Sequence, residues 1–596
     1  MKPTMKSLLF LQAAFYLPFT LALWPRPQNL TAGNTPLRLA AGFSIEISGI
    51  PQVPKDLSDA VTRTTKFLTT DKLQLLVPDR GASLTDAVNS AETLHSLTVT
   101  LSSSASSDVK SISEDAVAGL GVADESYTLQ VPAGGDATLT ANSALGLFRG
   151  LTTFEQLWFD LGGTTFTLQA PVHIEDAPVY PYRGFMLDTS RNYFPVSDIK
   201  RTLDAMSWVK INHFHWHVVD SQSFALVVPG FEEIAQKGAY SASRVYSPDD
   251  VKDIVSYAGA RGIDVMVEID TPGHSSVIFK SHPEHIACPE ATPWSRFAGE
   301  PPAGQLRLAS PATTNFTTDL IKAVSSMFPS TLFNTGGDEI NTNCYAKDNL
   351  TQEDLASQGK TLEEALDTFT QATHSALADA GKTPVVWEGI VPLAFLESLQ
   401  AHAASVEMAL EHQVNLRNDT IVLYAVYFVL SSTLPPLTGR NVYRVWISSE
   451  HVGSVAQKGF RLIHAASDFF YLDCGGGGWI GNNINGDSSC GVYKTWQKSY
   501  SFNPTNGLTE DQFDLVMGGQ QLLWAEQSGP SNLDSHVWPR AASSAELFWS
   551  GPGGDVKTAL PRLHEVGFRF IQRGVDAIPL QPEWCALRPN ACDGDA

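Results

Sequence analysis

Residues 331–340 read TLFNTGGDEI, a short apolar run that ends in two glycines and two adjacent carboxylic acids. Successive side chains of a strand point to opposite faces, so Asp338 and Glu339 can face one cavity only where the backbone bends. Gly336 and Gly337 allow such a bend because they lack a Cβ atom. Two carboxyl groups held together acquire separate pKa values, and one can then act as an acid near neutral pH. The stretch predicts either a catalytic pair or, as the simpler alternative, a solvated turn at a strand end.

The same pattern, an apolar run that ends in polar residues, recurs along the chain and alternates with segments of helix length. Eight such runs occur, and they are GFMLDTSRNY, NHFHWHVVD, IDVMVEIDTPGH, TLFNTGGDE, TPVVWEG, RVWISSE, FRLIHAASDFFYLD and DLVMGGQQLLWAE. Alternating strands and helices indicate a parallel sheet, and eight repeats indicate a (β/α)8 barrel. We therefore predict an α/β fold with a TIM-barrel catalytic domain at residues 178–596. Short alternating runs and one helical segment predict a smaller α+β accessory domain at residues 23–177.

Active sites of such barrels lie at the carboxyl ends of the strands. Charged and aromatic residues collect at these predicted ends, and they are Arg191, Asp220, Asp270, His274, Asp338, Glu339, Trp387, Glu388, Trp446, Tyr471, Asp473, Trp524 and Glu526. Carboxylates beside several tryptophans are typical of glycoside hydrolases. The apolar faces of sugars pack on indole rings, and their hydroxyl groups need charged partners.

The adjacency of the two acids favours one mechanism. Usual catalytic pairs lie about 5 Å or more apart across the scissile bond, and neighbours such as Asp338 and Glu339 cannot easily lie on opposite faces of one sugar. Their adjacency favours a reaction in which Glu339 donates the proton and the 2-acetamido oxygen of the substrate attacks its own anomeric carbon. Asp338 would orient the acetamide N–H, and a hydroxyl such as that of Tyr471 would hold the carbonyl oxygen.

The motifs also carry a family resemblance. They run in one order from Tyr182 to about Asp576 and are DTSRNY, FHWHVVDSQSF, EIDTPGH, GGDEI, VVWEG, VW at Trp446, DFFYLD, LLWAEQ and WPRAASSAELFW. Together they resemble the fungal β-N-acetylhexosaminidases of glycoside hydrolase family 20. The resemblance implies a retaining exo-hydrolase without a cofactor. It would remove terminal GlcNAc and GalNAc from chitooligosaccharides and glycoconjugates through an oxazolinium intermediate.

The resemblance also implies a role for each matched position. Glu339 would be the general acid/base, Asp338 the carboxylate that polarises the acetamide, and Tyr471 the acetamide hydrogen-bond donor. Walls of the sugar pocket would come from Trp387, Trp446 and Trp524. The 3- and 4-hydroxyl groups would be held by Arg191 and Glu526, and the 6-position by Asp473. Asp220 and His274 would form a relay that orients Glu339.

Two alternatives remain open on the residues alone. A catalytically silent sugar-binding lectin would keep the same barrel, because a fold does not determine a function. His213, His215 and His217 share one strand face and suggest a zinc site. Hydrogen bonds inside the barrel explain these histidines better, so we predict no metal.

The first residues have the composition of a secretory signal peptide. Lys2 and Lys6 precede the apolar run SLLFLQAAFYLPFTLAL, and small residues follow near Thr20 and Ala22. We therefore predict that residues 1–22 are removed and that the protein is extracellular, with no membrane attachment. The formal net charge of −23 excludes a broad nucleic-acid-binding surface. Because related enzymes are often dimers, the resemblance leaves a homodimer open.

Sequons and cysteines agree with export. The sequons predict N-glycosylation at Asn29, Asn315, Asn349 and Asn418. The six cysteines form an even set, which suits an oxidising compartment. Of the pairings that such a set allows, sequence order favours the disulfides Cys288–Cys344, Cys474–Cys490 and Cys585–Cys592.

Residues 423–443 break the alternation. They read LYAVYFVLSSTLPPLTGRNVY, with no helical spacing and several proline and glycine residues. Without them, the preceding DTIV would continue into RVW as one strand that leads to Trp446. We interpret the segment as a translated intron or similar error of the gene model, because an unpaired apolar insert inside a barrel strand fits no packing rule. A genuine loop specific to this protein is the alternative.

Overall fold

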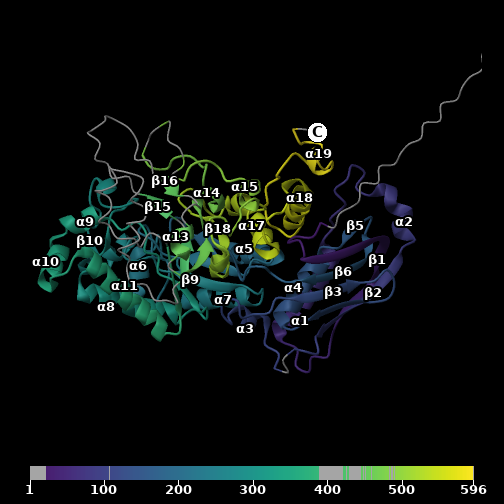
Figure 1. Cartoon of the computed structure of the whole chain (residues 1–596), viewed down its shortest axis with the longest axis horizontal. Helices are drawn as coiled ribbons and strands as arrows, with labels where there is room; N and C mark the ends of the chain where they lie inside the picture. Colours follow the sequence, from purple (N-terminus) through teal and green to yellow (C-terminus); the bar gives the residue numbers. More distant parts are fainter. Residues whose placement is uncertain are drawn as a thin grey trace, which may run out of the picture.

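The computed structural model describes residues 22–105, 108–387, 421–424, 426–428, 445–447, 449, 452–457, 459–481, 484, 488 and 490–594. They form two domains side by side, a smaller sheet domain from the first part of the chain and a larger barrel domain from the rest (Figure 1). Each domain has its own buried apolar core.

The smaller domain is a curled sheet covered by helices, as predicted. Its strands lie in the order β1-β2-β4-β3-β6-β5 and are β1 (Asn29–Ser48), β2 (Glu92–Leu101), β3 (Tyr127–Val131), β4 (Ala137–Ala141), β5 (Phe159–Leu161) and β6 (Thr164–Asp176). The long β1 pairs with β2 along one half and with β6 along the other, so it joins both sides of the sheet. Its helices are α1 (Lys55–Thr70), α2 (Thr85–Asn89), α3 (Ile112–Ala116) and α4 (Ala144–Glu155).

The larger domain is the predicted (β/α)8 barrel. Eight parallel strands close it in the order β7-β8-β9-β12-β13-β14-β17-β18. They are β7 (Tyr182–Asp188), β8 (His213–His217), β9 (Asp264–Glu268), β12 (Leu332–Asn334), β13 (Thr383–Trp387), β14 (Ile421–Tyr424), β17 (Arg461–His464) and β18 (Val516–Leu523). β7, β8 and β9 are buried at every residue, as expected for barrel strands covered by helices.

Helices and short strands surround the barrel. The helices are α5 (Val196–Trp208), α6 (Glu232–Gly238), α7 (Pro248–Gly259), α8 (Pro311–Ser325), α9 (Thr342–Lys347), α10 (Asn349–Gln358), α11 (Leu362–Asp379), α13 (Val452–Ala456), α14 (Ser467–Phe470), α15 (Trp496–Tyr500), α16 (Leu533–Val537), α17 (Ala542–Ser550), α18 (Val556–Gln572) and α19 (Glu583–Ala586). The short strands β10 (Ile286–Ala287) and β11 (Gln305–Leu306) pair with each other. None of the described helices is both long and apolar enough to cross a membrane.

The sixth barrel strand differs from the prediction. We expected RVWISSE in this place, but Ile421–Tyr424 fills it, because Ile421 pairs with Val385 of β13 and with Arg461 of β17. The strand β16 (Val445–Ile447), which contains Trp446, pairs instead with β15 (Val426–Phe428) in a separate antiparallel sheet. β15 thus lies inside residues 423–443 and β16 follows them, and the origin of this segment as an intron or a loop stays a prediction.

The three disulfides are those that sequence order favours. They join Cys288 to Cys344, Cys474 to Cys490, and Cys585 to Cys592. Asn29, Asn315 and Asn349 are exposed, which leaves the glycosylation prediction open at these sequons. The predicted leader, apart from Ala22, lies outside the described residues, and so do Glu388 and Asn418.

A buried ion network joins the two domains. Glu125 accepts hydrogen bonds from Arg149 of α4 at 2.7 Å and from Arg183 of β7 at 2.6 and 2.7 Å. Nearby, Lys210 lies 3.1 Å from Asp176. Burial raises the pKa of Glu125, but the two guanidinium groups outweigh burial and lower it to about 2. The carboxylate is therefore charged, and it pairs with one guanidinium group from each domain.

Glu125→Gln is expected to lower the free energy of unfolding at pH 7 by about 3–5 kcal/mol, because it leaves two buried guanidinium groups without their counter-charge. The pKa of Glu125 is depressed in the folded state, so its contribution is present above the ordinary pKa of 4.5 and is lost as the pH falls towards 2. Urea unfolding should therefore show a smaller difference between variant and wild type at pH 3. Glu175→Gln, at an exposed glutamate of β6, is the control, and an equal loss there would contradict the prediction.

Candidate active site

The acids of GGDE follow a sharp bend at the carboxyl end of β12. Gly336, Gly337 and Glu339 have positive φ angles of 67°, 107° and 50°. The Gly336 N–H donates to Asn334 Oδ1 at 2.9 Å, and the Gly337 N–H donates to Asp270 Oδ1 at 2.9 Å. Asp338 is only 7% exposed. The bend is therefore the predicted one, and the alternative of a solvated turn is wrong for these residues.

Gly336→Ala is expected to lower kcat by about 100-fold, since a shift near 1 Å in a catalytic group can have that effect. A Cβ atom at Gly336 would lie 1.8 Å from Asp270 Oδ1 and 2.7 Å from the Asp270 backbone. Gly381→Ala is the matched control. Its φ angle is 72°, but a Cβ atom there meets nothing within 4 Å. Steady-state kinetics of both variants is the measurement, and an equal loss of kcat in Gly336→Ala and Gly381→Ala would contradict the prediction.

His274 links the two acids to Asp220. Its Nδ1 lies 3.0 Å from Asp220 Oδ1, and its Nε2 lies 3.9 Å from Asp338 Oδ2 and 3.7 Å from Glu339 Oε2. Burial lowers the pKa of His274, but Asp220, with further carboxylates, raises it well above its ordinary value. A protonated imidazole thus faces both acids, and its role as a relay stays a prediction.

Arg191 lies among three carboxylates, two of which the sequence did not predict for the site. Its Nη1 is 3.0 Å from Asp220 Oδ2 and 3.1 Å from Asp188 Oδ2. Its Nε and Nη2 lie 3.0 and 2.5 Å from Glu300 Oε1. Burial lowers the pKa of Arg191, but these carboxylates raise it well above its usual range. The guanidinium is therefore held in place by carboxylates on several sides.

Asp270 lies at a predicted strand end, but the sequence predicts no role for it. Burial and the neighbouring Asp338 raise its pKa well above the ordinary value, so Asp270 is neutral and hydrogen-bonded beside Asp338. Of the residues that the sequence missed, Asp188 and Glu268 end strands β7 and β9, so the strand-end rule would have found them. Glu300 lies on the long connection between β9 and α8, where no local signal marks it.

Aromatic rings line the site. Trp387 and Trp524 have ring centroids 5.9 Å apart, and Tyr471 lies 6.2 Å from Trp524. The indole of Trp387 donates to Glu268 Oε1 at 2.7 Å. Burial raises the pKa of Tyr471 well above its ordinary value, so its hydroxyl keeps the proton. The side chain of Trp446 lies outside the described residues.

Two further acids follow β17 and β18, namely Asp473 after the short helix α14 and Glu526 shortly after β18. Asp473 accepts from the Trp524 N–H at 3.3 Å, and burial raises its pKa to about 7. Burial also raises the pKa of Glu526 well above its usual value, although Arg191 opposes this. Both groups are therefore protonated more readily than exposed acids and can donate to, as well as accept from, a hydroxyl group.

Two of the three histidines of β8 contact carboxylates, whereas the third, His213, contacts Asn212 Oδ1 at 2.8 Å. His215 Nε2 lies 2.5 Å from Glu268 Oε2, and His217 Nε2 lies 2.7 Å from Asp220 Oδ2. Among the described residues, three groups of side chains are close enough to hold a cation, namely Asp473–Cys474–Cys490, Asp220–His274–Glu300 and Asp270–His274–Asp338. The cysteines of the first group form a disulfide, Arg191 already contacts two members of the second, and the third contains Asp270, whose pKa is raised. These contacts favour a metal ion at none of the three groups.

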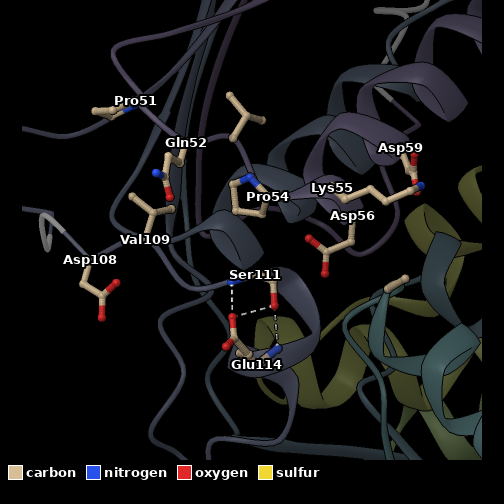
Figure 2. Close-up of a pocket in the computed structure, with 12 residues that line it drawn as sticks. Pro51, Gln52, Pro54, Lys55, Asp56, Asp59, Asp108, Val109, Ser111 and Glu114 are labelled. Atoms are coloured by element: carbon tan, nitrogen blue, oxygen red, sulfur yellow. Dashed lines mark hydrogen bonds and ion pairs between the residues drawn. The ribbon is translucent and has the colours of Figure 1, made fainter.

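A hollow of about 700 Å³ lies away from these residues, lined mainly by the smaller domain and by Ala260 of the barrel domain. Figure 2 shows that it is lined by residues such as Lys55, Asp56 and Asp108, with Ser111 and Glu114 joined in a helix cap. Its charged groups are not arranged around a buried acid pair. The candidate active site is therefore the strand-end cluster of the barrel, where the structure brings together Arg191, Asp220, His274, Asp338, Glu339, Trp387, Tyr471, Asp473, Trp524 and Glu526.

Comparisons with known proteins agree with this geometry. The profile "Glycosyl hydrolase family 20, catalytic domain" matches residues 180–552, and "beta-acetyl hexosaminidase like" matches residues 23–157. A beta-hexosaminidase of Arthroderma benhamiae is 33% identical over 79% of this chain and 74% of its own length. A chitooligosaccharidolytic beta-N-acetylglucosaminidase of Bombyx mori is 33% identical over 79% of this chain and 75% of its own. The structure of a Flavobacterium johnsoniae chitobiase superposes with a TM-score of 0.70 at 26% identity, covering 93% of this chain and 73% of that one.

Proposed function

Because the chain belongs to glycosyl hydrolase family 20, we propose that it is a retaining exo-β-N-acetylhexosaminidase that uses the acetamido group of its substrate as the nucleophile. The observation that carries the proposal is the pair Asp338 and Glu339 at one strand end, both within 3.9 Å of His274. A separate carboxylate nucleophile across the sugar is not needed when the substrate supplies its own.

The reaction would proceed in two balanced steps. In the first, the acetamido oxygen attacks the anomeric carbon, the glycosidic bond breaks, and Glu339 gives its proton to the leaving oxygen. Asp338 stabilises the positive charge that develops on the acetamide nitrogen, and the Tyr471 hydroxyl donates to the acetamide oxygen. In the second, Glu339 accepts a proton from water as that water attacks the anomeric carbon. The oxazolinium ring opens, and the β configuration is kept.

The substrate would be a terminal N-acetylhexosamine held between indole walls. Trp387 and Trp524 support its apolar face, and Trp446 would complete the pocket. Arg191 and Glu526 suit the 3- and 4-hydroxyl groups, and Asp473 suits the 6-position. We propose GlcNAc at the non-reducing end of chitooligosaccharides as the main substrate, with GalNAc also accepted. Chitooligosaccharide cleavage is supported by the name of the Bombyx mori relative.

We further propose that the protein is secreted, glycosylated at its sequons and free of metal, with residues 23–177 as an accessory domain. The molar mass in solution, measured by light scattering, tests whether the protein forms the homodimer that related enzymes suggest. The intact mass of protein made from sequenced cDNA tests residues 423–443. A mass that includes residues 423–443 would contradict an intron. A mass without them would mean that the β14 sequence continues directly into the segment that contains Trp446.

Hydrolysis of 4-nitrophenyl β-glycosides of GlcNAc and GalNAc tests the proposed function. We expect release of 4-nitrophenol from both, with the β configuration in the first product by NMR. Binding of GlcNAc without turnover would instead favour the lectin. An inverted product would contradict participation of the acetamido group.

A further inference from the structure

His217, the last residue of β8, lies between two buried carboxylates. Its Nε2 is 2.7 Å from Asp220 Oδ2 with hydrogen-bond geometry, and its Nδ1 is 3.2 Å from Glu268 Oε2 as an ion-pair contact. The edge of its ring also packs against Trp524, with centroids 4.9 Å apart. Its side chain is fully buried, so no water replaces these partners.

Glu268 holds a pocket wall and a histidine at the same time. Its Oε1 accepts from Trp387 Nε1 at 2.7 Å, whereas its Oε2 faces His217 and His215. Asn334 also donates to Oε2, at 3.1 Å. Movement of this carboxylate would therefore disturb both the indole wall and His217.

Asp220 divides its two oxygens between different partners. Oδ2 faces His217 and the Arg191 Nη1, whereas Oδ1 faces His274 Nδ1 and accepts from the Ser221 N–H at 2.5 Å. The carboxylate cannot turn towards another partner while His217 holds Oδ2. Its orientation decides where the ring of His274 points, and His274 in turn faces the acids of the candidate site.

We propose that His217 is a positioning residue of this active site: anchored on Glu268, it holds one oxygen of Asp220 so that the other directs His274 towards Asp338 and Glu339. The proposal rests on the proposed function, because it concerns the proton affinity of Glu339. His217 itself touches neither the sugar nor the reacting atoms.

Electrostatics supports this chain of contacts. Burial lowers the pKa of His217, but Glu268 and Asp220 raise it well above its ordinary value. Burial raises the pKa of Asp220, but Arg191, His274 and His217 bring it well below the usual range. Charges consequently alternate from Glu268 through His217 and Asp220 to His274. The loss of one charge in this series changes the electrostatic potential at Glu339.

His217→Gln tests the proposal, with His215→Gln as its matched control. Both residues lie on β8, are fully buried and contact Glu268 Oε2, but only His217 contacts Asp220. His217→Gln removes a positive charge, which favours the protonated form of Glu339. The basic limb of the pH dependence of kcat/KM should therefore move to higher pH by about half to one unit. The value of kcat should fall about 10–100-fold because Asp220 Oδ2 loses its hydrogen bond to His217 and keeps only its contact with Arg191.

In His215→Gln, the basic limb of the pH dependence of kcat/KM should stay at the wild-type pH. A variant that only folds less well loses amplitude and does not move the limb, so this readout separates positioning from stability. If the wild type is active and the basic limb of His217→Gln lies at the same pH as in the wild type, the proposal is overturned. A wild type that does not hydrolyse the N-acetylglucosaminide would instead overturn the proposed function.

A second measurement applies if His217→Gln does not fold. Wild-type protein labelled with ¹⁵N-histidine should keep at least two imidazolium rings, His217 and His274, at pH 8, where exposed histidines are neutral. Fewer than two such rings would contradict the alternating charges and overturn the proposal.

Discussion

Glu339→Gln is expected to lower kcat/KM for a β-linked GlcNAc disaccharide by about 1,000-fold, within the range that general acid catalysis contributes. Glutamine keeps the shape of the side chain but has no proton to give to the leaving sugar oxygen. A 4-nitrophenyl leaving group needs far less protonation, so its kcat/KM should fall by about 10–100-fold only. The measurement is the ratio of these two losses, because kcat/KM reports the steps up to glycosidic cleavage.

The control for this variant is Glu290→Gln. Glu290 is exposed and has a φ angle of 51°, close to the 50° of Glu339, so the same substitution is made on the same backbone conformation outside the site. We expect wild-type kinetics there. Equal losses of Glu339→Gln on both leaving groups would show that Glu339 does not protonate the leaving oxygen, and undiminished activity would remove it from the mechanism.

Asp338→Asn is expected to lower kcat by about 100–1,000-fold on N-acetylated substrates, the range found when one stabilising group is removed from a developing charge. The positive charge that arises on the acetamide nitrogen would then face a neutral amide. Asp270 would also lose the negative neighbour that helps to keep it neutral. Fluorination of the acetamido group weakens its oxygen as a nucleophile, so kcat/KM of the wild type should fall steeply with each added fluorine.

The variant is checked on the same substrate series. On substrates that lack the acetamido group, Asp338→Asn should have nearly the kcat of the wild type, because Asp338 has no amide to stabilise in them. Comparable losses with and without that group would contradict assistance by the substrate. Asp514→Asn is the control, since Asp514 is exposed just before β18, at the end of the barrel opposite the site.

The carboxyl-end rule explains why so much of the site followed from the sequence. Once eight apolar runs are taken as parallel strands, Arg191, Asp220, His274, Asp338 and Glu339 must gather at one end of the barrel. The rule does not tell which side chains touch. Glu300 illustrates this, because it contacts Arg191 across 109 residues of sequence and lies on a connection without a regular pattern.

The sixth strand shows the limit of strand patterns. Both Ile421–Tyr424 and Val445–Ile447 are short apolar runs, and either one suits a buried strand. Only pairing partners distinguish them, since Ile421 fits between Val385 and Arg461 while Trp446 pairs with Tyr427. A local pattern states that a segment can be a strand and leaves its neighbours undetermined.

The sequence by itself determined the barrel, the bend at GGDE and the adjacency of Asp338 and Glu339, because periodicity, glycine and chain order are local properties. Only the tertiary structure decided the charges of the site. Asp270 is neutral, and His217 and His274 are cationic, because burial and carboxylates from other strands act on them through space. Proton affinity depends on distances between strands, and those distances exist only once the barrel has closed.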